Sequence, residues 1–309
     1  MTRKASAWAP KGHVIAWDQF AMNDERMAPP RPRRTKPVEI ELTDTGIDVV
    51  SVGGELVVDG DITASLWRAP TDNDGVSQGW MAEAKGVRID WLRWGLDRLV
   101  VETDSIARRR RDGADLITVK RRLVGADASA VHQTKIRIEN GVATFSEQIA
   151  VPAEWHDLPR VGVRFEVPGA LDQLRWFGLG PDETYPDRRS AAVVGRWSTT
   201  VADQFHPYVV PQEHAAHVDT RWMSLIDDAG DGVTLAGEGP LIMTARADHD
   251  AALTAASTLA GLDPSTTTEV HIDTAVRGLG TAACGPDVLE RFVVRPGRHR
   301  FGWTLSGAR

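Results

Sequence analysis

The chain has 309 residues, of which 42% are hydrophobic and 26% are charged, enough for one large domain or two of medium size. Its formal net charge of −7 argues against nucleic acid as the main partner. The single cysteine excludes an internal disulfide framework, and neither a signal-peptide core nor a bilayer-spanning apolar run is present. We therefore expect a soluble, cytoplasmic protein that does not enter a membrane.

The N-terminal part reads as a fragment followed by a linker. The stretch 14–20 has the pattern of a single strand, which is too short to form a domain. A run rich in proline and arginine comes next, a composition typical of linkers. The sequence thus predicts a terminal strand remnant in residues 1–26, a linker in residues 27–37 and one main domain in residues 38–309.

Strand patterns fill the main domain. Ile47–Val52 precedes Gly53-Gly54, and Thr134–Glu139 precedes Asn140-Gly141, so each pair marks a hairpin. Residues 161–167 and 299–305 alternate between apolar and polar side chains, which indicates half-buried strands. This pattern predicts an all-β fold of large antiparallel sheets.

Helical patterns are scarce in this chain. Trp80, Ala84, Val87, Trp91 and Trp94 have near-helical spacing, although a glycine interrupts it. A second short helix is expected to be capped by the residue at position 248 and to run through position 256. The fold should therefore contain few and short helices.

Two dense polar stretches are candidates for chemistry. Glu183–Arg189 follows an aromatic strand end, and its many hydrogen-bonding side chains predict a loop held by its own contacts, either a structural corner or a ligand site. Trp67–Asp74 could bind a cation or a sugar. Alternatively, its acids cap a turn while Arg68 pairs with a buried acid, and this structural interpretation is favoured.

Signatures of catalysis are weak at the level of single motifs. His214 and His217 offer two nitrogen ligands, but no third ligand for zinc is evident. No phosphate-cradling glycine motif or nucleophile elbow occurs. Retaining glycoside hydrolysis needs two carboxyl groups about 5 Å apart, and no local motif identifies such a pair.

Four stretches together give the sequence a recognisable pattern. In this order, they resemble the C-terminal domain of the lac-type β-galactosidases of glycoside hydrolase family 2: WRAPTDND (67–74), WFGLGPDETYPDR (176–188), YVVPQEHAAHVDTRWMSL (208–225) and GLGTAACGPDVLERF (278–292). The resemblance covers the chain from about residue 38 to the end. The opening AWAPKGHVIAWDQF resembles the last strand of the immunoglobulin-like domain that precedes it in those enzymes.

The resemblance implies a fold and a division of labour. The fold is the β-supersandwich shared with galactose mutarotases. In the family, both catalytic glutamates and the magnesium ligands lie on a preceding (β/α)8 barrel, which is not in this sequence. No catalytic residue, metal ligand or cofactor is therefore expected in this chain, and Mg and Na are expected on the catalytic chain.

The resemblance also implies a substrate-binding loop. In the family, a loop near the C-terminus brings an aromatic ring against galactose, and it corresponds here to residues 281–286. Well-studied members carry a tryptophan there, whereas this chain has Ala282-Ala283-Cys284-Gly285. The absence of the ring removes about 1 kcal/mol of aromatic packing against the sugar. Cys284 is expected to be an inert, partly buried thiol. The substrate-binding candidates are Thr281, Ala282, Ala283, Cys284 and Gly285.

The leading hypothesis is a β-galactosidase component that completes the active site of a separate large chain carrying the barrel. Such a chain would be part of an enzyme acting on β-galactosides but inactive alone. The alternative is a non-catalytic carbohydrate-binding or assembly module, or a remnant of a split gene. A free-standing mutarotase, with His206, Glu213 or His217 as acid or base, rests on fold analogy alone.

Overall fold

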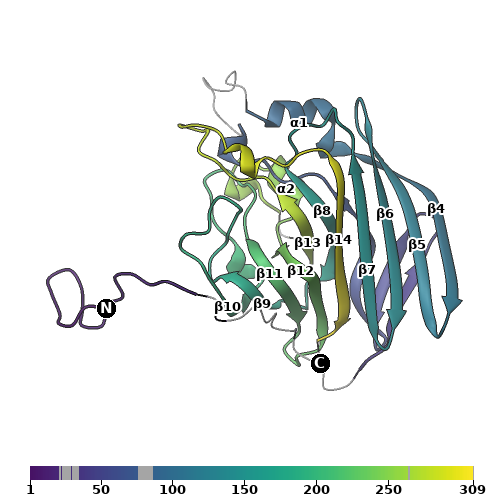
Figure 1. Cartoon of the computed structure of the whole chain (residues 1–309), viewed down its shortest axis with the longest axis horizontal. Coiled ribbons are helices and arrows are strands. Elements are labelled where there is room, and N and C mark those ends of the chain that lie inside the picture. The colour runs from purple at the N-terminus through teal and green to yellow at the C-terminus, as the bar shows by residue number, and fades with distance from the viewer. Residues whose placement is uncertain (21, 23–28, 30–34, 76–85, 264, 309) are drawn as a thin grey trace.

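The computed structural model describes residues 1–20, 22, 29, 35–75, 86–263 and 265–308. Within these ranges, fourteen strands form one continuous antiparallel sheet that folds on itself (Figure 1). The strands are β1 (Val38–Leu42), β2 (Ile47–Val52), β3 (Glu55–Ser65), β4 (Val100–Arg111), β5 (Ala114–Val124), β6 (Ser129–Glu139), β7 (Val142–Val151), β8 (Arg160–Pro168), β9 (Gln173–Gly180), β10 (Val193–Thr200), β11 (Ala216–Ile226), β12 (Gly232–Arg246), β13 (Thr267–Val276) and β14 (Gly297–Gly307).

The strand order shows how distant segments meet. The main path is β1-β2-β3-β8-β13-β12-β14-β7-β6-β5-β4, and β11, β9 and β10 branch from β12. Strands β4 to β7 form a meander on one side of the molecule, and β9 to β11 lie at the other (Figure 1). The prediction of an all-β supersandwich is confirmed.

Both predicted hairpins are present, and their turn residues have the expected backbone conformation. Asn140 and Gly141 have φ of 51° and 72°, and they connect β6 to β7. Gly53 and Gly54, with φ of 63° and 86°, connect β2 to β3. Positive φ at both central residues matches the twist of the flanking strands, so these dipeptides set the register of each hairpin.

The main core lies between the opposing faces of the folded sheet. Trp303 of β14 is fully buried, and its ring stacks on Phe145 at 3.9 Å and lies 5.7 Å from Phe165. A second apolar cluster, which includes Trp91, Trp94 and Trp155, packs under helix α1. Burial of alternate residues from many strands is what keeps such a sheet folded on itself.

Helices in the described ranges are short. They are α1 (Arg88–Trp94), α2 (Asp250–Ala255) and the 3-10 turns η1 (Asp72–Asp74), η3 (Leu96–Arg98), η4 (Ala202–Gln204), η5 (Leu259–Gly261) and η6 (Glu290–Phe292). None is long and apolar enough to cross a membrane. The first predicted helix is confirmed only for its last turns, because Trp80 and Ala84 lie outside the described residues.

The predicted start of the second helix is wrong by one position. The N-cap of α2 is His249 rather than Asp248. The Asp248 backbone carbonyl accepts a hydrogen bond from the Arg246 side chain, so this residue belongs to the turn that leaves β12. The acid that matters for the helix is Asp250, which lies inside its first turn.

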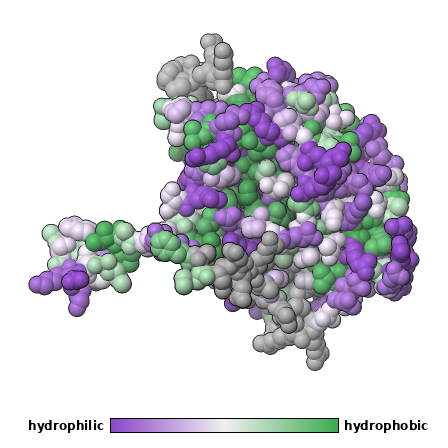
Figure 2. Space-filling model, viewed as in Figure 1, coloured by the Kyte–Doolittle hydropathy of each residue, from purple (hydrophilic) through white to green (hydrophobic). Residues whose placement is uncertain are grey.

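The N-terminal arm differs from the sequence expectation. Residues 13–20 contain no strand, so the predicted strand is not formed in this chain. A strand needs a partner for its backbone groups, whereas the contact that this segment makes with the body is between the Gln19 side chain and the backbone of Val194. Trp8 and Phe20 are 70% and 77% exposed on this arm, which projects from the body (Figure 2). The assignment of residues 1–26 to a preceding domain, and of 27–37 to a linker, stays a prediction.

Candidate functional site

The polar stretch Trp67–Asp74 folds around a buried ion pair. Arg68 Nη2 donates to both carboxylate oxygens of Asp74, at 2.8 and 2.9 Å, and both side chains are fully buried. Asp74 also accepts a hydrogen bond from the Thr71 backbone N–H at 2.9 Å, while Arg68 Nη1 donates to the carbonyl of Arg277. The structural interpretation of this stretch is confirmed, because the pair joins a turn to the end of β13.

The same stretch also holds the predicted substrate loop. Asn73 donates through Nδ2 to the Gly280 carbonyl at 2.9 Å and accepts from the Ala283 N–H at 3.0 Å. Asp187 accepts from the N–H groups of Leu279 and Gly280 at 2.9 and 2.8 Å. Three of the four recognisable stretches therefore meet at one loop, although about 100 to 200 residues separate them along the chain.

The loop presents its predicted residues at the surface. Thr281, Cys284 and Gly285 are exposed, whereas Ala282 and Ala283 are half-buried. The turn closes on itself, since Thr281 Oγ1 donates to the Pro286 carbonyl at 2.9 Å and the Cys284 N–H donates to the Thr281 carbonyl. The expectation of a partly buried thiol is wrong, because the turn directs Cys284 outward. The loop thus offers backbone groups and one thiol to whatever it contacts.

A second buried network, which we call the charge cluster, lies next to this junction. Its members are Arg160, Glu213, Arg246, Asp250, Glu269, His271 and Asp273. Glu213 is central, since its two oxygens accept from Arg160 at 2.5 Å and from Arg246 at 2.8 Å. Burial alone would raise the pKa of Glu213, but the two guanidinium groups outweigh it and lower this pKa to about 2. Glu213 therefore stays ionised and paired.

Part of the charge cluster has the spacing of a metal site. Asp250, Glu269 and His271 offer ligand atoms that lie within 4.8 Å of one another. However, Arg246 donates through Nη2 to both carboxylates, so a guanidinium already supplies the positive charge that they need. Its delocalised cation with fixed donors suits several carboxylates at once. The geometry favours an ion-pair network over a metal centre.

His214 and His217, the two histidines considered as zinc ligands, lie in different surroundings. His217 is fully buried, stacks on Trp176 with ring centroids 4.1 Å apart, and bonds through Nε2 to Gln204 Oε1 at 2.6 Å. His214 lies edge-on to Phe205, with Nε2 at 3.8 Å from Asp248. Burial lowers the pKa of both rings, to about 4 for His214 and about 3 for His217. They do not form a metal pair.

These positions also bear on mutarotase chemistry. Of the three acid or base candidates, Glu213 and His217 are buried and bonded within the protein, and only His206 is exposed. A general acid or base must reach the proton that it transfers. The structure does not bring these three groups together at a surface where a sugar can sit.

The depressed pKa of His217 predicts a measurable acid sensitivity. As pH falls below about 6.5, the unfolded chain binds a proton at this ring, whereas the folded chain does so only near pH 3. Stability from this group is therefore lost as pH falls. When the pH is lowered from 7 to 5, the unfolding free energy of the wild type should fall because of this ring. We expect the fall to be about 2 kcal/mol smaller in His217→Gln. Urea unfolding at both pH values measures this.

The control for that experiment is the same substitution at His13, which is exposed on the N-terminal arm. The comparison uses the pH slope rather than absolute stability, because His217→Gln also loses the contact with Trp176. Equal slopes for His217→Gln and the wild type would show that the buried ring does not stay neutral in the folded chain.

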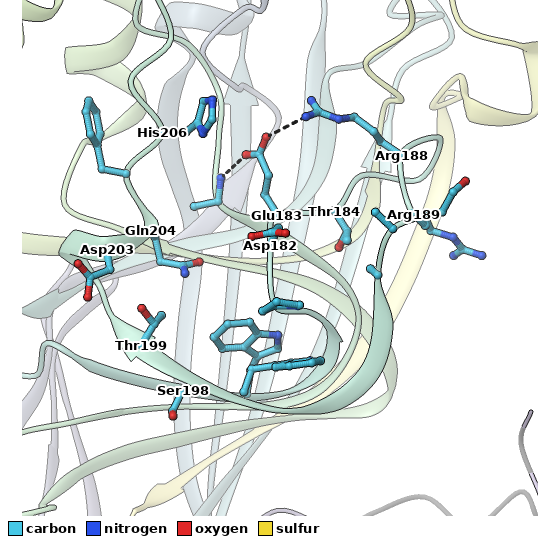
Figure 3. Close-up of a pocket in the computed structure, with 18 of the residues that line it drawn as sticks. Asp182, Glu183, Thr184, Arg188, Arg189, Ser198, Thr199, Asp203, Gln204 and His206 are labelled. Carbon is cyan, nitrogen blue, oxygen red and sulfur yellow. Dashed lines mark hydrogen bonds and ion pairs between the residues drawn. The ribbon is translucent and has the colours of Figure 1, made fainter. Parts of the chain in front are cut away.

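The loop after β9 is held in place by hydrogen bonds of its polar side chains, as its sequence predicts. The Glu183 carboxylate accepts from the Tyr208 hydroxyl at 2.6 Å and from the Ala215 N–H at 2.9 Å. Arg188 lies 3.6 Å from the same carboxylate (Figure 3). Together with Asp187, Glu183 makes this loop a rigid corner beside the predicted substrate loop.

Comparison with known proteins identifies the family to which this chain belongs. Residues 36–305 match the family model of the β-galactosidase small chain. The chain belongs to this family. The match spans nearly the whole folded body, from just before β1 to near the end of β14.

Individual relatives carry the same name. A β-galactosidase of Arthrobacter sp. is 32% identical over 95% of this chain, and one of Vibrio cholerae is 28% identical over 73%. The chain spans only 31% and 24% of those two proteins. Among solved structures, a galactose mutarotase-like protein from Lactobacillus casei covers 89% of this chain and 98% of its own, at 9% identity and a TM-score of 0.45.

Proposed function

We propose that this chain is a component of a β-galactosidase and completes an active site carried by a separate chain or domain with a (β/α)8 barrel. The observation that carries this proposal is the family match over residues 36–305, combined with coverage of under a third of the β-galactosidases it resembles. The remaining two thirds of such an enzyme would hold the catalytic carboxylates and the Mg and Na ions. The substrate would be a terminal β-D-galactoside, hydrolysed with retention.

The state of the buried acids supports this division of labour. Asp74, Glu213 and Glu269 are deeply buried, and each one faces an arginine. A carboxyl group that is paired in this way is poorly placed to act as nucleophile or as acid toward a glycosidic oxygen. We therefore expect negligible hydrolysis by this chain alone.

The substrate loop is the part that we propose for contact with the galactoside. Asn73 and Asp187 hold it in one conformation at the surface, so its five residues could be presented to a neighbouring chain without reordering. Because the loop carries no aromatic side chain, its backbone groups and Cys284 would make the contact.

Cys284 gives a direct test of where the partner binds. It is the only cysteine and it is exposed, so it should react readily with a thiol reagent in the free chain. If the loop enters the active site of the partner, saturating partner should slow this labelling at least about tenfold, since access to the thiolate controls its rate. A spectrophotometric thiol assay measures the rate.

A matched control places a cysteine elsewhere. The Cys284→Ser chain with Arg110→Cys carries its thiol on the exposed edge strand β4, at the opposite side of the molecule from β9 to β11. Its labelling should be indifferent to the partner. Protection at position 110 but not at 284 would contradict the proposed orientation of the complex.

The alternative of a non-catalytic carbohydrate-binding module has one observation in its favour, a cavity beside the substrate loop. This alternative predicts that sugar binds to the chain alone, with or without a catalytic partner. The two functions are compatible, because the cavity and the loop are built from different residues.

A further inference from the structure

A cavity of about 750 Å³ opens between the loop after β9 and the segment after β10. Its volume is within the range of about 300–1,000 Å³ that small-molecule sites occupy. Asp182, Thr199 and Gln204 surround it (Figure 3). Indole rings from two paired positions, Trp176 and Trp197, contribute to its lining.

The Trp197 indole occupies space that is free because Gly180 and Gly195 have no side chain. A Cβ at Gly180 would lie 2.6 Å from the Trp197 Cδ1 and Nε1, and a Cβ at Gly195 would lie 2.9 Å from its Cζ2. The Trp197 Nε1–H also donates to the Gly178 carbonyl at 3.2 Å. One face of the ring therefore rests on the backbone of β9 and β10, and the half-buried ring lines the cavity. This is a flat, fixed apolar surface.

A buried histidine orients a polar group at the same cavity. His217 is neutral, because burial lowers its pKa to about 3. Since Gln204 Oε1 can only accept, His217 Nε2 carries the proton of their 2.6 Å hydrogen bond. The Gln204 side-chain oxygen is thus already used as the acceptor of this hydrogen bond. Its amide Nε2 has no partner among the described residues, so two N–H donors are left for the cavity.

The acids of this region divide into two kinds. Glu183 and Asp187 use their oxygens to hold backbone N–H groups, as described above. By contrast, the side chains of Asp182 and Asp203 are exposed at the cavity and bond to no other described residue. These two carboxylates are free acceptors.

The charge of the cavity selects among ligands. Its two arginines are already engaged, Arg188 with Glu183 at 3.6 Å and Arg189 with Asp219 at 3.5 Å. The acidic side chains of Asp182 and Asp203, which have neither an ion-pair nor a hydrogen-bond partner among the described residues, repel phosphates and other anions. A neutral ligand rich in hydroxyl groups fits best, because it can donate to the carboxylates and accept from the Gln204 amide.

We propose that this cavity binds one pyranose ring of a neutral saccharide, with the apolar face of the sugar on the Trp197 indole and its hydroxyl groups bonded to Asp182 and Gln204. A pyranose has the required combination of one flat face of C–H groups and a rim of hydroxyl groups. The inference goes beyond the proposed function, since every group that it uses belongs to this chain and no hydrolysis is involved.

The test is saccharide binding by the purified chain, with methyl β-D-galactopyranoside and methyl β-D-glucopyranoside as probes and NMR titration as the measurement. The wild type should bind at least one of them saturably. Asp182→Asn should weaken binding about tenfold, because it removes a charged acceptor. Trp197→Ala should weaken it about two- to tenfold.

Controls keep this test independent of folding and of the β-galactosidase proposal. Asp182 is exposed and unbonded, so its substitution should leave the unfolding midpoint unchanged even if Trp197→Ala unfolds the hairpin. Asp172→Asn, at an exposed acid outside the cavity, should bind as the wild type does. Failure of both probes to bind the wild type, or equal affinity for the wild type and Asp182→Asn, would overturn the proposal.

Discussion

Replacing Glu213 with glutamine should lower the unfolding free energy of this chain by about 3–5 kcal/mol, the cost typical of breaking a buried ion pair from one side. The side chain is fully buried and accepts from Arg160 and Arg246, both of which are also buried. Glutamine keeps the size of the side chain but removes its charge. Two guanidinium groups would then lie in a low-dielectric interior with less compensation.

Urea unfolding at pH 7 measures this effect, with Glu139→Gln as the matched control. Glu139 also pairs with an arginine, at 2.8 Å, but its side chain is 42% exposed. Exposed pairs contribute about 0–1 kcal/mol. If both substitutions cost the same, the charge cluster does not carry the stability that its burial implies.

The second large effect should follow from Trp303→Ala, which removes the centre of the main core. Such truncations cost about 3–5 kcal/mol. Trp303 is fully buried, stacks on Phe145, and donates through Nε1 to Glu147 at 3.2 Å. The substitution therefore leaves a cavity and also removes one donor from a buried carboxylate.

A tryptophan on the N-terminal arm provides the comparison. Trp8 is 70% exposed, so Trp8→Ala should change the unfolding free energy by less than about 0.5 kcal/mol. Thermal unfolding of the two variants side by side measures the difference. A loss at Trp303 no larger than that at Trp8 would mean that the stacked aromatic core contributes little.

Local signals in the sequence were sufficient for two hairpin turns and for several of the strands in the main domain. Asn140-Gly141 specifies a hairpin because both residues tolerate positive φ, which few other residues do. Arg68 and Asp74 are close in sequence, so an internal pair is a natural use for them. The alternation in β8 and β14 is likewise a short-range pattern that follows from which face is buried.

Contacts between distant segments were not predictable in the same way. Asn73 meets Ala283 because β13 pairs with β8, which in turn pairs with β3, and no periodicity in the sequence encodes that arrangement. The glycines at 180 and 195 make room for the Trp197 ring in the structure, and no local pattern in the sequence predicts this role. The cavity therefore became visible only in three dimensions.

The sequence also placed the family motifs without explaining them. Two of the four stretches prove to support the loop of a third, with Asn73 and Asp187 as the residues that bond to its backbone. Their spacing along the chain gave no hint of this shared role. The prediction that Cys284 is partly buried was wrong for a related reason, because the exposure of a residue in a turn depends on the contacts that hold that turn.

The most direct test of the account is hydrolysis of a chromogenic β-galactoside by the purified chain, by a barrel-bearing chain from the same organism, and by their equimolar mixture. The proposal predicts negligible activity for this chain alone and activity that appears on mixing. A barrel-bearing chain that is equally active with and without this chain would contradict it. Hydrolysis by this chain alone would contradict it as well, since carboxylates of this chain would then have to be catalytic.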